Sequence, residues 1–408
     1  MTGIRYRYTF LPIAQPQQTG SSPKKAVVPI REVEVTASDA GAENEGMNLL
    51  LLRDSRIGHF NQTLGIALAV ERLETVERTV LDTRPSFFAP GDVRKLVMRR
   101  FGKDAAFWLR AMYGIHVGAL TKPDLIAGSG TQTIAAGILL ACFFAVPFVY
   151  SGQIDGYDTV DVALQLVHTP HAATLPGRAY TPIPCTIDAA MFSEPRPLRE
   201  PADLVGADIG LLIGGTAYRR KYEISEWEAL GALVVGVAER FAVNWRVSTS
   251  RRTPPIVADI FSRLEARGHV RQFIDYRVSG PGSARDIFGA DAVVVTGDSM
   301  SMIAEGIAAG RPVVALKSAK VQKGYANEAI AAMVGEGGAA IVPLASVTPD
   351  EFARTLLGVR NPGRDARGII AAAVAPLIRP SRTPSPAQDR SRPALILSST
   401  VPPSPPAS

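Results

Sequence analysis

Cysteine and histidine, the usual side chains of disulfide and metal sites, are scarce in this chain. Its 408 residues contain 2 cysteines and 5 histidines. Cys142 and Cys185 stand in apolar or proline-flanked contexts without metal-ligand spacing, so no disulfide framework is expected. No glutamate or further ligand completes a site beside His168 and His171, so we expect no metal. This usage favours a reducing, cytoplasmic compartment.

Long uninterrupted hydrophobic runs are also missing. The strongest run, residues 134–150, is at the lower length limit of a membrane span and is broken by Pro147. We expect instead a buried helix at about residues 131–144 and a buried strand at about residues 146–150, with a membrane span as the weaker alternative. No apolar stretch follows Arg5 and Arg7, so no signal peptide is predicted.

A concentrated basic surface is not evident from the charge distribution. The net charge is +6, but residues 379–408 contain four arginines against one aspartate, and residues 1–48 hold five basic and five acidic residues. The rest of the chain is therefore only weakly basic and shows no alternation of basic and aromatic residues. We expect no nucleic-acid partner.

Alternating strand and helix patterns predict an α/β fold. Buried strands without polar alternation are followed by helical segments, first from residue 49 and again from residue 203. This order is typical of two doubly wound, Rossmann-like domains that face a cleft at the carboxyl ends of their strands. The predicted parts are a loose extension (1–48), an N-terminal acceptor domain (49–192), a proline-rich linker (193–202), a C-terminal donor domain (203–378) and a disordered Pro/Ser/Arg tail (379–408).

The stretch from residue 290 to residue 305 is the most informative one. It predicts a buried strand over residues 292–295, a polar turn from Thr296 to Ser299, and a helix that contains Glu305. Free N–H groups and the helix dipole make such a helix start an anion site. Glu305 is then close enough to receive the ribose hydroxyls of a nucleotide. An ordinary strand–helix–strand unit is the alternative interpretation.

Two further strand ends in the C-terminal half carry suitable groups. A Gly-Gly-Thr turn allows backbone amides to approach a phosphate, and Arg251 and Arg252 precede a helix that starts near Pro254. Two guanidinium groups at that position could clamp a diphosphate, although solvated surface arginines are the plainer interpretation. The residues of these turns are Gly214, Gly215, Thr216, Ser250, Arg251, Arg252 and Thr253.

The first strand of the N-terminal half is followed by Gly58, His59, Asn61 and Gln62. His59 is the candidate catalytic base, because imidazole is the side chain suited to proton transfer near neutral pH, while a purely structural role in the turn is the alternative. Gly58, Asn61 and Gln62 are candidate substrate-binding residues. His168 and His171 could orient an acceptor at another strand end.

Five sequence blocks together resemble a known family. They are residues 58–62, 168–171, 214–216, 250–254 and 295–305, and the match spans residues 49–358. Their order and spacing are similar to the mitochondrial-fission Elm-one-type family, whose bacterial members are described as glycosyltransferases or, in older usage, nucleoside-diphosphate-sugar epimerases. His171-Ala172 departs from the usual His-Asp pair of the family.

The resemblance implies a GT-B architecture that binds a nucleotide sugar in its C-terminal domain without a catalytic metal or other cofactor. It implies transfer of the sugar to a glycan or lipid-linked acceptor of the cell envelope, by a cytoplasmic protein in contact with the inner membrane. The alternatives are a nucleoside-diphosphate-sugar epimerase and a non-catalytic adaptor recruited to membranes. In the last block, the donor-binding candidates are Thr296, Asp298, Ser299, Met300, Ser301 and Glu305.

Overall fold

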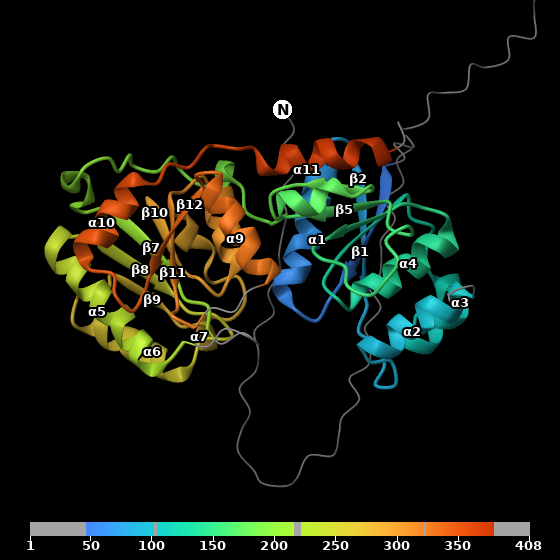
Figure 1. Cartoon of the computed structure of the whole chain (residues 1–408), viewed down its shortest axis with the longest axis horizontal. Helices are drawn as coiled ribbons and strands as arrows, with labels where there is room; N and C mark the ends of the chain where they lie inside the picture. Colours follow the sequence, from blue (N-terminus) through green and yellow to red (C-terminus); the bar gives the residue numbers. More distant parts are fainter. Residues whose placement is uncertain (1–45, 102–103, 216–221, 321–323, 379–408) are drawn as a thin grey trace, which may run out of the picture. The chain divides into compact units, whose positions relative to one another are not determined.

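The computed structural model describes residues 46–101, 104–215, 222–320 and 324–378. These described residues belong to one compact unit, which contains two parallel sheets of six strands each. The predicted fold class of two doubly wound α/β sheets is thus confirmed (Figure 1). The predicted N-terminal extension up to residue 45, Thr216 and the tail after residue 378 lie outside the described residues.

The N-terminal sheet has the strand order β2-β1-β3-β4-β5-β6. In β1, Leu50 and Leu52 belong to one core cluster and Leu49 and Leu51 to another. Both faces of the strand are therefore buried, which explains its continuous run of leucines. The elements are β1 (Met47–Arg53), α1 (Ile57–Val70), β2 (Val76–Asp82), α2 (Gly91–Phe101), α3 (Ala105–Tyr113), β3 (Leu125–Ser129), α4 (Thr133–Phe144), β4 (Phe148–Ser151), β5 (Leu164–Val167) and β6 (Arg178–Tyr180).

The apolar run that begins at Ile134 forms the buried helix α4 and the strand β4, as expected. Among the described residues, no helix is both long enough and apolar enough to cross a membrane. The edge strand β6 was not expected, because its three residues lie in a proline-rich stretch and have no alternating pattern.

The C-terminal sheet has the order β12-β11-β10-β7-β8-β9, so β10 and β7 are neighbours at its centre. Val293 and Val295 pack on one face of β10, and Ala292 and Val294 on the other. The elements are β7 (Asp208–Leu212), α5 (Ile224–Phe241), β8 (Asn244–Ser248), α6 (Pro255–Ala266), β9 (Gln272–Ile274), α7 (Tyr276–Ser279), β10 (Ala292–Thr296), α8 (Met300–Ala308), β11 (Val313–Lys317), α9 (Tyr325–Gly335), β12 (Ala339–Pro343), α10 (Pro349–Gly358) and α11 (Ala366–Val374).

The last helix, α11, returns to the N-terminal sheet. Ile370, Ala371 and Val374 share a core cluster with Leu49 and Leu51 of β1. Arg72, just after α1, adds an ion pair with Asp365, the N-cap residue of α11, in which Nη1 contacts both carboxylate oxygens. The helix therefore follows the C-terminal sheet in sequence but belongs to the N-terminal core (Figure 1).

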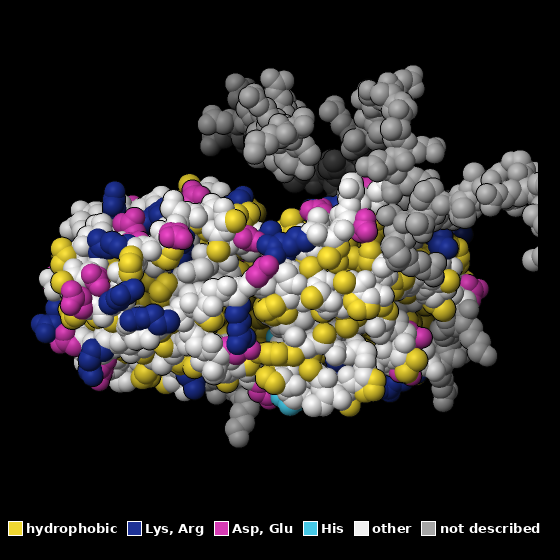
Figure 2. Space-filling view, turned by 90° about the horizontal axis from the view of Figure 1, so that it is seen from above, with side chains coloured by type: hydrophobic (Ala, Val, Ile, Leu, Met, Phe, Trp, Pro, Cys, Tyr) yellow, Lys and Arg dark blue, Asp and Glu magenta, His cyan; other side chains and the backbone are white. Residues whose placement is uncertain are grey.

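Charged side chains are unevenly distributed on the face shown in Figure 2. Basic and acidic side chains are interspersed on the left of that view, while hydrophobic side chains are more frequent toward the right.

Candidate functional site

The carboxyl end of β10 carries a buried carboxylate, Asp298. It accepts hydrogen bonds from the Thr296 hydroxyl (2.7 Å) and from the backbone N–H of Gly215 (3.1 Å). Arg252 Nη1 lies 2.9 Å from the same carboxylate. Burial raises the pKa of Asp298, and these partners offset only part of that effect. The buried side chain of Asp298 thus joins the ends of β7, β8 and β10.

The two glycines after β7 are explained by this carboxylate. A Cβ atom on Gly214 would lie 2.3 Å from Asp298 Oδ2, and one on Gly215 would lie 2.1 Å from the carbonyl oxygen of Arg252. Gly215 also has φ +148°, which disfavours other residues. The Gly214 N–H donates to Thr296 Oγ1 at 2.7 Å. Both amides that the sequence offered to a phosphate therefore have partners within the protein.

The hydroxyl groups of the β8–α6 turn also bond internally. Ser250 Oγ donates to the Gly214 carbonyl oxygen at 2.6 Å, and Thr253 Oγ1 donates to the same oxygen at 2.5 Å. Arg251 differs from them, because its side chain is exposed and forms no ion pair among the described residues. Arg251 is therefore the cation of this turn that remains available to a ligand.

Helix α8 begins at the same edge. Ser299 is its N-cap and accepts a hydrogen bond from the Met302 N–H at 3.4 Å. The first turn of α8 contains no acidic residue, so the N–H groups of Met300 and Ser301 and the positive end of the helix dipole are not neutralised by a side chain of that turn.

The N-terminus of α1 meets the N-terminus of α8. A Cβ atom built on Gly58 would lie 3.9 Å from Ser301 Oγ, so the first turns of both helices adjoin. α1 also has no acidic residue in its first turn and no side-chain cap, and the exposed Arg56 is its N-cap residue. Two positive helix ends and a cation thus converge, an arrangement that attracts an anion.

Glu305 and Asn61 form the second contact between these helices. Burial raises the pKa of Glu305 to about 7, while a hydrogen bond from the Asn61 side chain lowers it by a smaller amount. The side chain therefore changes its charge near neutral pH. The predicted ribose ligand and the predicted substrate-binding asparagine are brought together here.

His59 has an acidic neighbour that the sequence analysis missed. Asp54 Oδ2 lies 3.2 Å from His59 Nδ1, and the Asp54 side chain is almost fully buried. Burial would raise the pKa of Asp54, but His59 and the backbone N–H groups of Arg56 and Gln132 hold it below its usual range. Asp54 is therefore ionised, and its carboxylate faces the Nδ1 side of the His59 ring, away from Nε2.

Gly130 makes the approach of Asp54 and His59 possible. Its φ is +92°, and a Cβ atom there would lie 2.3 Å from both Asp54 Oδ2 and His59 Nδ1. The turn between β3 and α4 is thus shaped around this pair.

Gln62 and His168 lie in a buried network under the edge of the N-terminal sheet. Gln62 Oε1 accepts hydrogen bonds from Ser129 and Ser151, and Ser151 Oγ lies 3.1 Å from His168 Nε2. His168 Nδ1 lies 3.1 Å from the Thr181 carbonyl oxygen. Burial lowers the pKa of His168 to about 4, so its ring is neutral at pH 7. These side chains tie β3, β4 and β5 to the residue after β6.

His171 lies apart from this network. It is exposed, and its Nε2 atom is 3.6 Å from Glu328 Oε2 on α9. Of the predicted residues, the structure therefore brings Gly58 next to the first turn of α8 and Asn61 to Glu305 of that helix. His59 pairs with Asp54, whereas Gln62, His168 and His171 have other partners.

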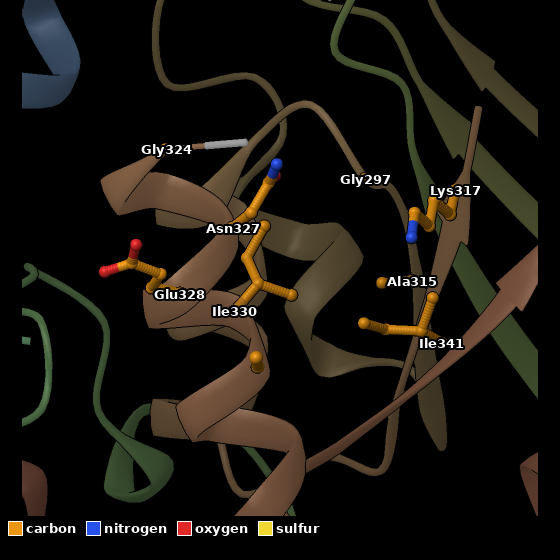
Figure 3. Close-up of a pocket in the computed structure, with 9 residues that line it drawn as sticks. Gly297, Ala315, Lys317, Gly324, Asn327, Glu328, Ile330 and Ile341 are labelled. Atoms are coloured by element: carbon orange, nitrogen blue, oxygen red, sulfur yellow. The ribbon is translucent and has the colours of Figure 1, made fainter. Parts of the chain in front are cut away.

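A cavity of about 540 Å³ adjoins the β10–α8 turn (Figure 3). Its wall is apolar at Ala315, Ile330 and Ile341, and Gly297 borders it. Figure 3 shows Lys317 and Asn327 near its rim, with Glu328 turned away from it. The volume is within the range of small-ligand sites.

Sequence reasoning did not select Lys317, Asn327, Asp54 or Arg56. Arg56 and Asp54 directly precede the selected Gly58-His59 turn, so a wider window around that turn would have found both. The residues around the cavity come from the β10–α8 turn, β11, α9 and β12, and they share no local sequence signal. No group of three or more histidine, cysteine or carboxylate residues suited to a metal ion occurs in the described part of the chain.

Comparison with solved structures finds proteins of similar backbone architecture. The chain is similar to the S. aureus MnaA–UDP co-structure, with 13% identity over 81% of this chain and 95% of that chain and a TM-score of 0.49. It is also similar to the Methanocaldococcus jannaschii UDP-GlcNAc 2-epimerase in complex with UDP-GlcNAc and UDP (12% identity, 81% and 98% covered, TM-score 0.46). A third is Acinetobacter baumannii MurG (12% identity, 81% and 94% covered, TM-score 0.44).

Comparison with curated proteins finds no match to the sequence. The sequence model of a family described as mitochondrial fission ELM1 matches residues 183–353, a range that includes β7, β8, β10 and α8. The blocks at residues 58–62 and 168–171 lie outside the match. Over residues 183–353, the match confirms the family resemblance that the sequence motifs predict.

Proposed function

We propose that this chain is a metal-independent glycosyltransferase that binds a nucleoside-diphosphate sugar and transfers the sugar to a glycan or lipid-linked acceptor. The diphosphate lies where the N-termini of α1 and α8 converge. The protein acts in the cytoplasm, next to the inner face of the membrane.

The observation that carries this proposal is the approach of Gly58 to Ser301. Two helix N-termini repel one another unless an anion lies between or beside them. A diphosphate supplies charge and several acceptor oxygens, which suit the N–H groups of Met300 and Ser301. Arg251, which is exposed and has no ion pair among the described residues, supplies the matching cation.

Arg252 and Asp298 have a structural role in this proposal. Their ion pair, at 2.9 Å, holds the ends of β8 and β10 in place. Arg252 is still partly exposed and can share its remaining donors with a phosphate oxygen, while Asp298 fixes its position.

Glu305 receives the ribose hydroxyls in this proposal. In the absence of nucleotide it binds Asn61, so the ribose competes with that amide or joins it. Burial favours the neutral carboxyl form of Glu305, whereas hydrogen bonds from the ribose hydroxyls favour its charged carboxylate form. Nucleotide binding should therefore lower the pKa of Glu305 and release protons near pH 7.

His59 serves as the general base that activates the acceptor hydroxyl. Asp54 holds the ring from the Nδ1 side, so Nε2 takes the proton. The cavity beside Gly297 receives the sugar, because an apolar wall with an amide and an ammonium group nearby suits a ring that carries hydroxyl groups.

A thermal-shift panel of nucleotides and nucleotide sugars tests the proposal. A ligand that binds only the folded state raises the melting temperature in proportion to ln(1 + [L]/Kd). We expect a shift with nucleoside diphosphates and their sugars, and a smaller one with nucleosides. No shift with any nucleotide would favour the adaptor alternative and would contradict the proposal.

A further inference from the structure

An exposed aromatic loop precedes α2 in the N-terminal half. Phe87 and Phe88 are 93% and 85% exposed and contact each other edge to face, with ring centroids 5.7 Å apart. Exposed phenylalanine pairs are costly in water and mark contact sites. The proposed sugar transfer does not use them.

Hydrogen bonds to α3 and α2 fix the backbone of this loop. The Ser86 N–H donates to the Met112 carbonyl oxygen of α3 at 2.7 Å, and Arg94 Nη1 donates to the Ala89 carbonyl oxygen at 3.0 Å. Ala89 is buried in the core cluster below. The two rings are therefore presented by a fixed backbone.

Helix α2 extends the apolar surface. Val93 and Leu96, one turn apart, are 40% and 56% exposed, whereas the neighbouring Val97 packs into the core. We name Phe87, Phe88, Val93 and Leu96 the aromatic surface. Figure 1 shows α2 and α3 (cyan) together beside the N-terminal sheet.

The segment that carries the aromatic surface also contains four basic residues. Arg84, Lys95, Arg99 and Arg110 form no ion pair among the described residues. Two exposed acids oppose them, Asp92 in the first turn of α2 and Asp104 at the N-cap of α3. Asp82 also interacts with Arg84, but its charge is already paired with Arg53. Helix N-termini neutralise part of both negative charges, so the surface has a positive excess.

We propose that the aromatic surface docks this protein on a bilayer that contains anionic lipid. The phenylalanine rings enter the boundary between headgroups and acyl chains, and Arg84, Lys95 and Arg99 contact the headgroups.

The size and shape of the surface favour lipid over a protein partner. Two phenylalanines bury about 400 Å² at most, and the partly exposed Val93 and Leu96 add smaller areas, whereas a stable dimer needs about 800 Å² on each side. A protruding pair of rings with basic residues in the same segment matches the chemistry of an anionic interface.

Vesicle flotation with the full chain tests this proposal. Vesicles of phosphatidylcholine alone are compared with vesicles that also contain about a third phosphatidylserine, at low and high salt. Wild type should float with the anionic vesicles and should bind more weakly at high salt. Phe87→Ser with Phe88→Ser should lower binding about tenfold or more, because both apolar anchors are lost. Arg84→Gln with Arg99→Gln should reduce the difference between the two vesicle types.

Val278→Ser is the matched control, since Val278 is 86% exposed in α7, outside the aromatic surface. It should bind as wild type does. Circular dichroism should show every variant folded. Nucleotide binding by the Phe87/Phe88 variant should be unchanged, so failure of this proposal is distinct from failure of the proposed transferase.

Absence of wild-type binding, or equal binding by the Phe87/Phe88 variant, would overturn the proposal. A concentration-dependent dimer that the same variant abolishes, without any vesicle binding, would identify the surface as a contact between copies and would overturn it too.

Discussion

Replacement of Glu305 by glutamine should remove a pH dependence of stability. The folded state raises the pKa of this carboxyl from 4.5 to about 7. Between these values the folded state binds the proton more tightly than the unfolded state, so the free energy of unfolding falls as pH rises. The contribution is fully present below about pH 4.5 and is lost as pH passes through about 7.

The magnitude follows from the shift. At about 1.4 kcal/mol per pKa unit, this shift would change the free energy of unfolding by about 3 kcal/mol if the side chain were completely buried. The residue is only partly buried by surface area, so solvent reduces this value, and we expect about 1–3 kcal/mol. Glutamine keeps a hydrogen-bonding partner for Asn61 and carries no charge. Glu305→Gln should therefore be more stable than wild type at pH 8 by this amount, and nearly equal to it at pH 5.

Urea unfolding, followed by tryptophan fluorescence at pH 5, 6, 7 and 8, measures the effect. Glu228→Gln on α5 is the matched control, because Glu228 is exposed and forms no ion pair in the described part of the chain. It should keep the wild-type pH dependence. If Glu305→Gln loses as much stability as wild type between pH 5 and pH 8, Glu305 does not titrate in this range and the reasoning fails.

Three other predictions concern the turns and the chemistry. Gly214→Ala should lower the free energy of unfolding by about 2–4 kcal/mol, because its Cβ would overlap Asp298. The control Gly358→Ala has open space around its Cβ and should leave the stability unchanged. Equal effects of the two variants in urea unfolding would refute this prediction. His59→Ala should cut turnover about a hundredfold and Asp54→Asn about tenfold, both with unchanged nucleotide affinity; turnover close to wild type would exclude His59 as the base. Turnover should survive a chelator, and activity that only a divalent cation restores would place the enzyme in another class.

The local sequence pattern was sufficient to predict most of the helices and strands. Continuous apolar runs such as Leu49–Leu52 and residues 292–295 predict buried parallel strands, because both faces of these strands meet a core. β6 escaped prediction because three residues are too short to show a period. The return of α11 to the N-terminal sheet also could not be predicted, because its partners lie far away in sequence.

The strand ends that form the candidate site could be predicted, but the hydrogen bonds and ion pairs within it could not. Glycine, hydroxyl and arginine residues at these strand ends indicate where we expect a ligand to bind. Asp298 contacts Arg252 and Gly215 only because β10, β7 and β8 are neighbours in the sheet. A local motif cannot predict this strand order. Gly214 and Gly215 are thus required because a Cβ atom at either position would clash with a neighbouring group, a reason that the phosphate-binding interpretation did not include.

Calorimetric titration with uridine diphosphate, uridine and the Arg251→Ala variant tests the central claim most directly. If the diphosphate binds at the converging helix ends, uridine should bind at least about a hundredfold more weakly than the diphosphate. Arg251→Ala should weaken diphosphate binding by about 2 kcal/mol, roughly thirtyfold, while the exposed Arg267→Ala control leaves it unchanged. Equal affinity for uridine and its diphosphate, or unchanged diphosphate affinity in Arg251→Ala, would contradict the account.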